Sequence, residues 1–340
     1  MNHLTHWSDL PDGIWDACLD RALELRAANA WPRTAHDSAI ALVFLNPSLR
    51  TRASMELAAA RLGAESVTLT PGTETWSLEW RDDARMDASA AEHVREAMGV
   101  LGRYADALGV RTFASLTDYE ADHSDAAFRA VVAASDVPVV NLESARWHPC
   151  QALADAAALR ETLGDPRGKK FVLQWAPHPK ALPQAVPNSA LMMAARLGME
   201  VLVSRPEGFA LASDVMETAS ATAARFGGSV VETADRDTGL AGAHAVYVKA
   251  WSGDLVYDNP DEEARRRAAH SSWRLSESDF LKTNHGRFMH CLPVRRDVVV
   301  GADVLESERA IHLLQAEYRL FAQMAILEWL WDLNDASSKA

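Results

Sequence analysis

The sequence predicts an α/β protein of two domains, each with a parallel sheet covered by helices. Short apolar runs alternate with helical patterns along most of the chain, which is the order expected of parallel strands joined by helical crossovers. The length of 340 residues suits two domains of ordinary size, and a Gly- and Pro-containing break stands at 164–168. We expect domains at 1–150 and 151–312, with a C-terminal helix at 313–334 that packs back on the first.

The strands are predicted from the apolar runs and the helices from the patterns between them. Residues 40–45 predict a buried strand, and Asn46-Pro47-Ser48 turns into a helix at 50–62. Gly63 stands at the expected C-cap of that helix. Further strands are expected at 66–70, 107–110, 137–141, 170–175, 200–204, 229–232, 245–249 and 287–290. Further helices are expected at 90–104, 123–134, 149–163, 188–197, 213–226 and 313–332.

Composition and charge exclude several classes of protein. With 34 basic and 47 acidic residues, the net charge of −13 argues against a nucleic-acid binder. No apolar run reaches the roughly 18 residues of a membrane span, and the N-terminus lacks the pattern of a secretory signal. Three distant cysteines, Cys18, Cys150 and Cys291, indicate neither disulfides nor a metal site. We therefore expect a cytoplasmic protein without metal or cofactor, in which any anion is bound by a local cationic group.

The segment Ser48-Leu49-Arg50-Thr51-Arg52 follows a predicted strand and opens a predicted helix. Free backbone N–H groups and the helix dipole favour an anion at that place. The hydroxyls of Ser48 and Thr51 add donors, and the guanidiniums of Arg50 and Arg52 suit phosphate. A capped helix with surface arginines explains the pattern equally well.

Two further segments lie at strand ends. In His148-Pro149-Cys150-Gln151, His148 and Gln151 share one side of the predicted helix, and both can donate to a developing oxyanion. Taken alone, His148 is better explained as a helix cap or a buried structural histidine. In His290-Cys291-Leu292-Pro293, a cysteine nucleophile is disfavoured because a sequence-adjacent histidine is poorly placed to activate it.

A proline-rich stretch follows the strand at 170–175. Four prolines fall within residues 177–187, together with His178 and Lys180. Proline fixes the backbone, so a rigid surface connection and a binding loop are both consistent with this stretch.

Taken together, the three motifs resemble the aspartate/ornithine carbamoyltransferase superfamily over nearly the whole chain. They match its Ser-x-Arg-Thr-Arg, His-Pro-x-Gln and His-Cys-Leu-Pro segments in order. The Asp-x-x-x-Ser-Met-Gly segment for free ornithine is absent, and residues 247–251 read Tyr-Val-Lys-Ala-Trp instead. With the proline-rich stretch, this resembles the branch acting on N-acylated ornithine. That resemblance implies a trefoil knot, in which residues 235–255 thread a loop containing 177–187.

The resemblance implies that carbamoyl phosphate gives its carbamoyl group to the δ-amine of an N-acyl-L-ornithine in arginine biosynthesis, without metal or covalent intermediate. The phosphate would be held by Ser48, Leu49, Arg50, Thr51 and Arg52. The carbonyl would be polarised by Thr51, Arg111, His148 and Gln151. The amine would be oriented by the main-chain carbonyls of Cys291 and Leu292. Arg319 would face the carbamoyl phosphate, although a solvated helix face is its alternative.

The remaining expectations concern the oligomer and the acyl group. Trp76 resembles a residue inserted into the neighbouring subunit's site, which implies a homotrimer with shared active sites; local packing is the alternative. Glu143 and Lys249 resemble the pair that fixes the α-amide and α-carboxylate side of the substrate, a plain salt bridge being the alternative. For an acyl carboxylate, the nearest cationic candidates are His178, Lys180 and Arg296.

Two positions favour a succinyl group over an acetyl group. Ala91 stands where acetylornithine enzymes resemble one another in having Glu, which would repel a succinyl carboxylate. A slip of one position would put Glu92 there instead. Val299 stands where those enzymes have a carboxylated Lys. We therefore expect N-succinyl-L-ornithine in preference to N-acetyl-L-ornithine, with free ornithine or another amine disfavoured by the missing Ser-Met-Gly segment. A non-catalytic relative is disfavoured by the intact motifs, and a dinucleotide-binding dehydrogenase by the lack of Gly-x-Gly-x-x-Gly.

Overall fold

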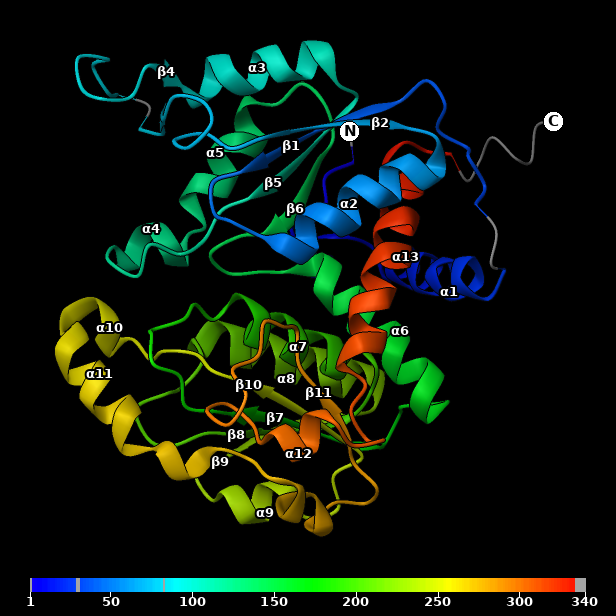
Figure 1. Ribbon diagram of the computed structural model, residues 1–340, viewed down its shortest axis with the longest axis vertical. Coiled ribbons are helices and arrows are strands. Elements are labelled where there is room, and N and C mark those ends of the chain that lie inside the picture. The colour runs from blue at the N-terminus through cyan, green and yellow to red at the C-terminus, as the bar shows by residue number, and fades with distance from the viewer. Residues whose placement is uncertain (1, 29–30, 82, 334–340) are drawn as a thin grey trace. The chain divides into compact units, whose positions relative to one another are not determined.

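The computed structural model describes residues 2–28, 31–81 and 83–333. They divide into two compact units (Figure 1). The first unit takes its residues from Met1–Ser115, Glu120–Leu153 and Tyr318–Ala340, and the second from Leu116–Tyr119 and Ala154–Glu317. The predicted C-terminal helix is α13, His312–Leu330, whose second half belongs to the first unit. Residue 334, the predicted end of that helix, lies outside the described residues.

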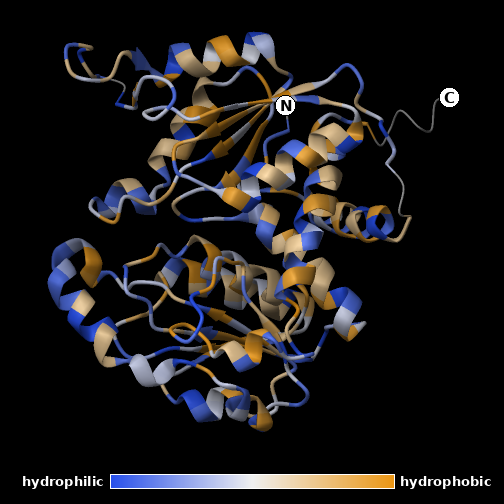
Figure 2. Ribbon diagram, viewed as in Figure 1, coloured by the Kyte–Doolittle hydropathy of each residue, from blue (hydrophilic) through white to orange (hydrophobic). Residues whose placement is uncertain are grey.

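The sheet of the first unit has the strand order β2-β1-β5-β6, and every neighbouring pair is parallel. Its strands are β1 (Ala39–Phe44), β2 (Glu65–Leu69), β5 (Ala107–Arg111) and β6 (Val139–Glu143). Strands β1, β5 and β6 are buried almost throughout and mostly apolar (Figure 2), because helices leave no face of these parallel strands to water. The edge strand β2 is largely exposed.

Helices and one small sheet complete the first unit and the connections around it. The helices before the second sheet are η1 (Trp7–Asp9), α1 (Asp12–Ala28), α2 (Leu49–Leu62), α3 (Val94–Tyr104), α4 (Tyr119–His123) and α5 (Ala126–Ala134). The apolar faces of α3 and α5 pack against β1, β5 and β6 in one core cluster. Strands β3 (Leu78–Glu79) and β4 (Glu92–His93) pair with each other and enclose the segment that contains Ala91.

The second unit has a five-stranded parallel sheet of order β11-β10-β7-β8-β9. Its strands are β7 (Lys170–Trp175), β8 (Glu200–Ser204), β9 (Ser229–Thr233), β10 (Ala245–Lys249) and β11 (Arg287–Met289). The helices from α6 onward are α6 (Pro149–Leu163), α7 (Ala185–Arg196), α8 (Ser213–Phe226), α9 (Arg236–Leu240), α10 (Leu255–Asp258), α11 (Pro260–Ala269), η2 (Ser271–Trp273), η3 (Glu277–Lys282) and α12 (Ala302–Leu305).

The predicted fold class, two parallel sheets covered by helices, is confirmed. Gly63 ends α2 with φ 87° and donates its N–H to Ala59 and Ala60, as its position predicted. Several boundaries differ, and two helix starts have a clear local cause. Helix α3 begins at Val94 because the His93 side chain accepts the Arg95 N–H and caps it. Helix α7 begins at Ala185, with Pro187 in its first turn, where a missing N–H costs no helical bond. The proline-rich loop therefore ends at Gln184.

No helix within the described ranges is long and apolar enough to cross a membrane.

Candidate active site

Helix α2 starts at the carboxyl end of β1, and Ser48 is its N-cap. The Ser48 Oγ accepts the N–H of Thr51 at 3.2 Å, which fixes the first turn. Asn46 ties this loop to the end of β5, since its Oδ1 accepts the Phe113 N–H at 2.7 Å. The remaining N–H groups of the first turn and the helix dipole make this end attractive to an anion.

Arg319 reaches this place from helix α13. Its Nη2 donates to Thr51 Oγ1 at 3.1 Å, and its Nη1 donates to Gln151 Oε1 at 2.7 Å and lies 3.4 Å from His148 Nε2. His148 and Gln151 thus face the same side of α6, as their spacing predicted. All four side chains are buried. Arg319 is therefore not on a solvated helix face.

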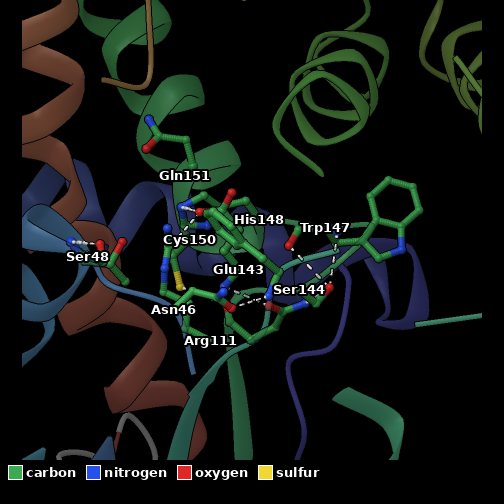
Figure 3. A network of polar contacts seen from close by, with 12 residues as sticks. Asn46, Ser48, Arg111, Glu143, Ser144, Trp147, His148, Cys150 and Gln151 are labelled. Atoms are coloured by element: carbon green, nitrogen blue, oxygen red, sulfur yellow. Dashed lines mark hydrogen bonds and ion pairs between the residues drawn. The ribbon is translucent and has the colours of Figure 1, made fainter. Parts of the chain in front are cut away.

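Arg111 and Glu143 form a buried ion pair beside this group. Arg111 ends β5, and its Nη1 donates to Glu143 Oε2 at the end of β6 (Figure 3). The same carboxylate oxygen lies 3.4 Å from His148 Nε2. Glu143 has φ 149°, a strained conformation for a residue with a side chain. Its N–H is held by Asn141 Oδ1 at 2.9 Å.

The turn that presents His148 has its own polar network (Figure 3). Ser144 Oγ donates to the buried Asp125 carboxylate at 2.5 Å, and Asp125 also accepts the Ala145 N–H at 3.1 Å. Asn141 Nδ2 donates to Ser144 Oγ at 3.0 Å. The Ser144 N–H donates to the Trp147 carbonyl at 2.9 Å. These contacts fix the backbone that leads into His148.

The electrostatics of the group favour a neutral His148 and a bound anion. Burial, followed by the positive charges of Arg319, Arg111 and Arg50, holds the pKa of His148 well below its usual 6.5. The imidazole is therefore uncharged at neutral pH and can donate one N–H to an oxygen. Buried guanidiniums are costly unless they meet an anion. Glu143 serves Arg111 in this way, and a second anion would be stabilised at the α2 N-terminus.

The side chains of Arg52, Arg50, Leu49 and Trp76 differ in their exposure and partners. Arg52 is exposed and pairs with Glu56 of its own helix, Nε to Oε1 at 3.0 Å. Arg50 is half-buried, and the Leu49 side chain is 79 % exposed, so that only its backbone N–H suits an anion. Trp76 is 60 % exposed, and its Nε1 donates to Glu92 Oε2 at 2.6 Å.

The second unit holds a separate cationic group around His178. Arg295 Nε donates to His178 Nε2 at 3.0 Å, and Arg267 Nη1 donates to the His178 carbonyl at 2.7 Å. Because a guanidinium only donates, the proton of the neutral ring lies on Nδ1, which faces the Lys180 carbonyl at 2.8 Å. Burial, and then the charges of Lys249, Arg295 and Arg267, lowers the pKa of His178. These groups suit a carboxylate.

Arg296 is the arginine predicted as a candidate for the acyl carboxylate, whereas the arginine in contact with His178 is its neighbour Arg295. Arg296 is exposed, and its Nη1 pairs with Glu306 Oε1 at 2.5 Å. The Lys180 side chain is exposed as well, and only its backbone contacts His178. Two adjacent arginines carry the same sequence signal, and only the conformation of the loop after Pro293 separates them. Lys249 belongs to this unit and Glu143 to the other, so their pairing stays a prediction.

The His290-Cys291-Leu292-Pro293 motif follows β11. Cys291 and Leu292 are half-buried, whereas Cys18 and Cys150 are buried, with thiol pKa values raised to about 12 and about 11, chiefly by burial. Among the described residues, no group of three or more His, Cys, Asp or Glu is placed to hold a metal ion.

Comparison with known proteins covers both units. The family model for the aspartate/ornithine carbamoyltransferase carbamoyl-P binding domain matches residues 2–161, and that for the Asp/Orn binding domain matches 183–330. An N-acetylornithine carbamoyltransferase of Xanthomonas campestris is 40% identical over 96% of this chain and 97% of its own. An N-succinylornithine carbamoyltransferase of Bacteroides thetaiotaomicron is 34% identical over 85% and 86%.

A solved structure extends the likeness to the fold. It is an N-acetyl-L-ornithine transcarbamylase with one glutamate replaced by alanine, complexed with carbamyl phosphate and N-succinyl-L-norvaline. Its TM-score is 0.93 at 40% identity, covering 97% of this chain and 100% of the other. The two family models together span most of the described residues. The chain belongs to the aspartate/ornithine carbamoyltransferase family.

Proposed function

We propose that this chain transfers the carbamoyl group of carbamoyl phosphate to the δ-amine of an N-acyl-L-ornithine. The observation that carries the proposal is the convergence of Arg111, Arg319, Gln151 and a neutral His148 on the N-terminus of α2. The family membership and the named relatives support it.

The first unit suits carbamoyl phosphate. Its phosphate accepts hydrogen bonds from the N–H groups of the first turn of α2, and the charges of Arg319 and Arg50 stabilise it. The carbonyl oxygen accepts hydrogen bonds from Arg111 and His148. Because the imidazole of His148 is neutral, it donates its N–H without bringing another positive charge towards the attacking amine. Thr51 and Gln151 orient Arg319 through its two guanidinium nitrogens.

The second unit suits the amino-acid substrate. His178, Arg295 and Lys249 attract its carboxylate, and the carbonyls of Cys291 and Leu292 accept N–H groups of the δ-amine. The neutral amine attacks the carbamoyl carbon and forms a tetrahedral oxyanion. The C–O bond to phosphate then breaks, and the phosphate leaves with the proton that the amine nitrogen gives up.

The test is a comparison of kcat/KM for N-succinylornithine, N-acetylornithine and ornithine with saturating carbamoyl phosphate. We expect both acylated amines to exceed ornithine by at least about 100-fold, since ornithine brings an unpaired α-ammonium into a cationic group. Equal or greater turnover of ornithine would refute the acylornithine assignment.

We further propose a preference for the succinyl group. Ala91 is exposed and lies just before β4, and Val299 is buried in the apolar core of the second unit. The related transcarbamylase in which one glutamate is alanine was solved with a succinyl ligand. Ala91 standing at that glutamate's position would leave a succinyl carboxylate without a like charge opposite it.

N-acetylornithine is the second candidate, and one contact favours it. The Glu92 carboxylate lies next to Ala91 and accepts Trp76 Nε1–H at 2.6 Å. If Trp76 enters a site, that carboxylate goes with it and would repel a succinyl carboxylate. The relative of higher identity is also an acetylornithine enzyme. Ala91→Glu tests the choice: we expect succinylornithine turnover to fall with acetylornithine turnover largely kept, and an equal loss of both would remove Ala91 from the choice.

We also propose a homotrimer with shared sites. Its support is Trp76, a large apolar side chain that is 60 % exposed. Analytical ultracentrifugation should give three chains of 37.2 kDa. Mixing inactive Trp76→Ala and Arg111→Ala chains should restore activity, because some mixed sites then hold both native residues. Absence of restoration in proven mixed trimers would refute sharing.

The knot of the second unit is proposed on the contacts between its two segments. Ser252 N–H donates to the Leu182 carbonyl at 3.0 Å, Leu182 N–H donates to Ser252 Oγ at 3.2 Å, and Gln184 Nε2 donates to the Ser252 carbonyl at 2.8 Å. Such contacts are those expected where residues 235–255 pass through a loop containing 177–187. The test is a crystallographic chain trace whose two ends are joined into a closed curve. A knotted chain gives a trefoil, whereas a curve that reduces to a plain circle would refute the knot.

A further inference from the structure

The Cys291–Leu292 turn is strained and must be held in place by its surroundings. Leu292 has φ 58°, a left-handed conformation that is unfavourable for a residue with a side chain. Its N–H donates to His290 Nδ1 at 2.8 Å, which closes the turn on the histidine ring. The position of the turn therefore depends on what fixes His290.

Two buried side chains from other elements hold His290. Its backbone N–H donates to Gln315 Oε1 at 2.9 Å, and Gln315 Nε2 donates to Asp155 Oδ1 at 2.6 Å. Gln315 lies in the first turn of α13 and is 0% exposed, and Asp155 lies in α6 and is 1% exposed. The hydrogen-bond chain thus runs from the turn after β11 through α13 to α6, within the second unit.

The polarity of this chain requires an amide at position 315. The side chain must accept from the His290 N–H with one atom and donate to a carboxylate with the other, which glutamine does and glutamate does not. Two carboxyl groups at that distance in a buried place would have to share a proton.

Tyr247 of β10 lies beside the strand that leads into the same turn. Tyr247 is 0% exposed and lies in register with Met289, just before the motif. Burial, and then Asp155 and Cys291, raises the pKa of the Tyr247 phenol well above its usual value. Asp155 and Cys291 thus both act on this buried phenol.

We propose that Gln315 and Asp155 are positioning residues that set the orientation of the Cys291 and Leu292 carbonyls. The proposal rests on the proposed function, in which those carbonyls orient the attacking amine. Neither side chain takes part in a bond-making step. They act by selecting one orientation of a strained turn that would otherwise relax.

The test uses a reversal of hydrogen-bond polarity. Gln315→Glu places two acceptors against the carboxylate of Asp155, and the double variant with Asp155→Asn restores one donor to one acceptor. We expect Gln315→Glu to lower kcat by about 100-fold, as a misplacement of about 1 Å does. The KM for carbamoyl phosphate should stay unchanged, and the double variant should recover most of the loss. Gln323→Glu, an equally buried change eight residues along the same helix, controls for the cost of a buried carboxyl.

The pH profile separates positioning from a merely structural role. In Gln315→Glu the shared proton is lost as the pH rises, so kcat should fall further at pH 9 than at pH 6. Lower thermal stability alone would not produce that dependence. The proposal is overturned if Gln315→Glu retains the wild-type kcat, or if the double variant recovers nothing.

A second measurement does not depend on turnover. Iodoacetamide alkylation of Cys291, followed by mass spectrometry, reads the state of the turn, and the buried Cys18 and Cys150 should stay unreacted. Cys291 should be alkylated faster in Gln315→Glu than in the wild type, and its rate in the double variant should return to the wild-type value. An unchanged rate in Gln315→Glu overturns the inference. Wild-type protein that transfers no carbamoyl group to any amine refutes the proposed function instead, and the alkylation result still decides the inference.

Discussion

Glu143 occupies the position at which a bound anion would compete with it for Arg111. Its carboxylate accepts a hydrogen bond from Arg111 and lies 3.4 Å from His148 Nε2. Glu143→Gln keeps the size and one acceptor of the side chain but removes the charge. An anion entering the site then meets no like charge, while Arg111 loses its counter-ion and gains more from the anion.

The expected magnitude follows from the burial of this pair. Hydrogen bonds to charged groups contribute about 1.5–3 kcal/mol, and removing one partner of a buried pair costs more. Because glutamine retains a neutral hydrogen bond with Arg111, we take about 2 kcal/mol as the part that a bound anion would recover. At about 1.4 kcal/mol for each factor of ten, phosphate should bind Glu143→Gln about 30-fold more tightly than wild type.

The assay is isothermal titration of inorganic phosphate into the two proteins at equal ionic strength. Glu56→Gln is the matched control, since Glu56 pairs with Arg52 at the exposed side of α2. It should change phosphate affinity little, because surface pairs contribute about 0–1 kcal/mol. Equal or weaker phosphate binding by Glu143→Gln would show that Glu143 does not compete with an anion as the counter-ion of Arg111.

Three other predictions concern His148, Arg295 and Cys150. The lowered pKa of His148 means that below pH 6.5 the unfolded chain takes up a proton and the folded chain does not. The free energy of unfolding should therefore fall as the pH drops from 6.5, by up to about 1.4 kcal/mol per pH unit. Urea unfolding of His148→Gln should lack this slope, and an unchanged slope would contradict a buried neutral ring. Arg295→Gln should raise the KM for acylornithine by about 10–100-fold, as expected for a lost charged hydrogen bond, whereas Arg296→Gln should leave the KM unchanged; the reverse result would favour Arg296. Cys150, with a thiol pKa raised to about 11, should resist iodoacetamide at pH 8 while Cys291 reacts, and equal rates would contradict its burial.

The helices that sequence analysis did not anticipate show what periodicity misses. Helix α11, Pro260–Ala269, carries few apolar residues. It is stabilised by ion pairs four residues apart, Glu262 with Arg266 and Glu263 with Arg267. Such a segment lacks the apolar face by which an amphipathic helix is identified. Strands β3 and β4 are two residues each and too short for any period.

The sequence by itself determined the two parallel sheets and the places where ligands meet them. A strand buried on both faces is mostly apolar, so the strands β1 and β7 can be predicted from their own residues without knowledge of their neighbours. The cap at Ser48 and the spacing of His148 and Gln151 can also be predicted, because each involves residues within one helical turn of each other.

Only the tertiary structure decided which charged side chains act together. Arg319 contacts Thr51, 268 positions away, whereas Arg52, inside the motif, turns to Glu56 four residues on. Arg295 and not Arg296 lies against His178. Local patterns record whether a residue is buried or exposed in its own element. The partner of a side chain depends on where the chain returns, and neither composition nor period encodes that path.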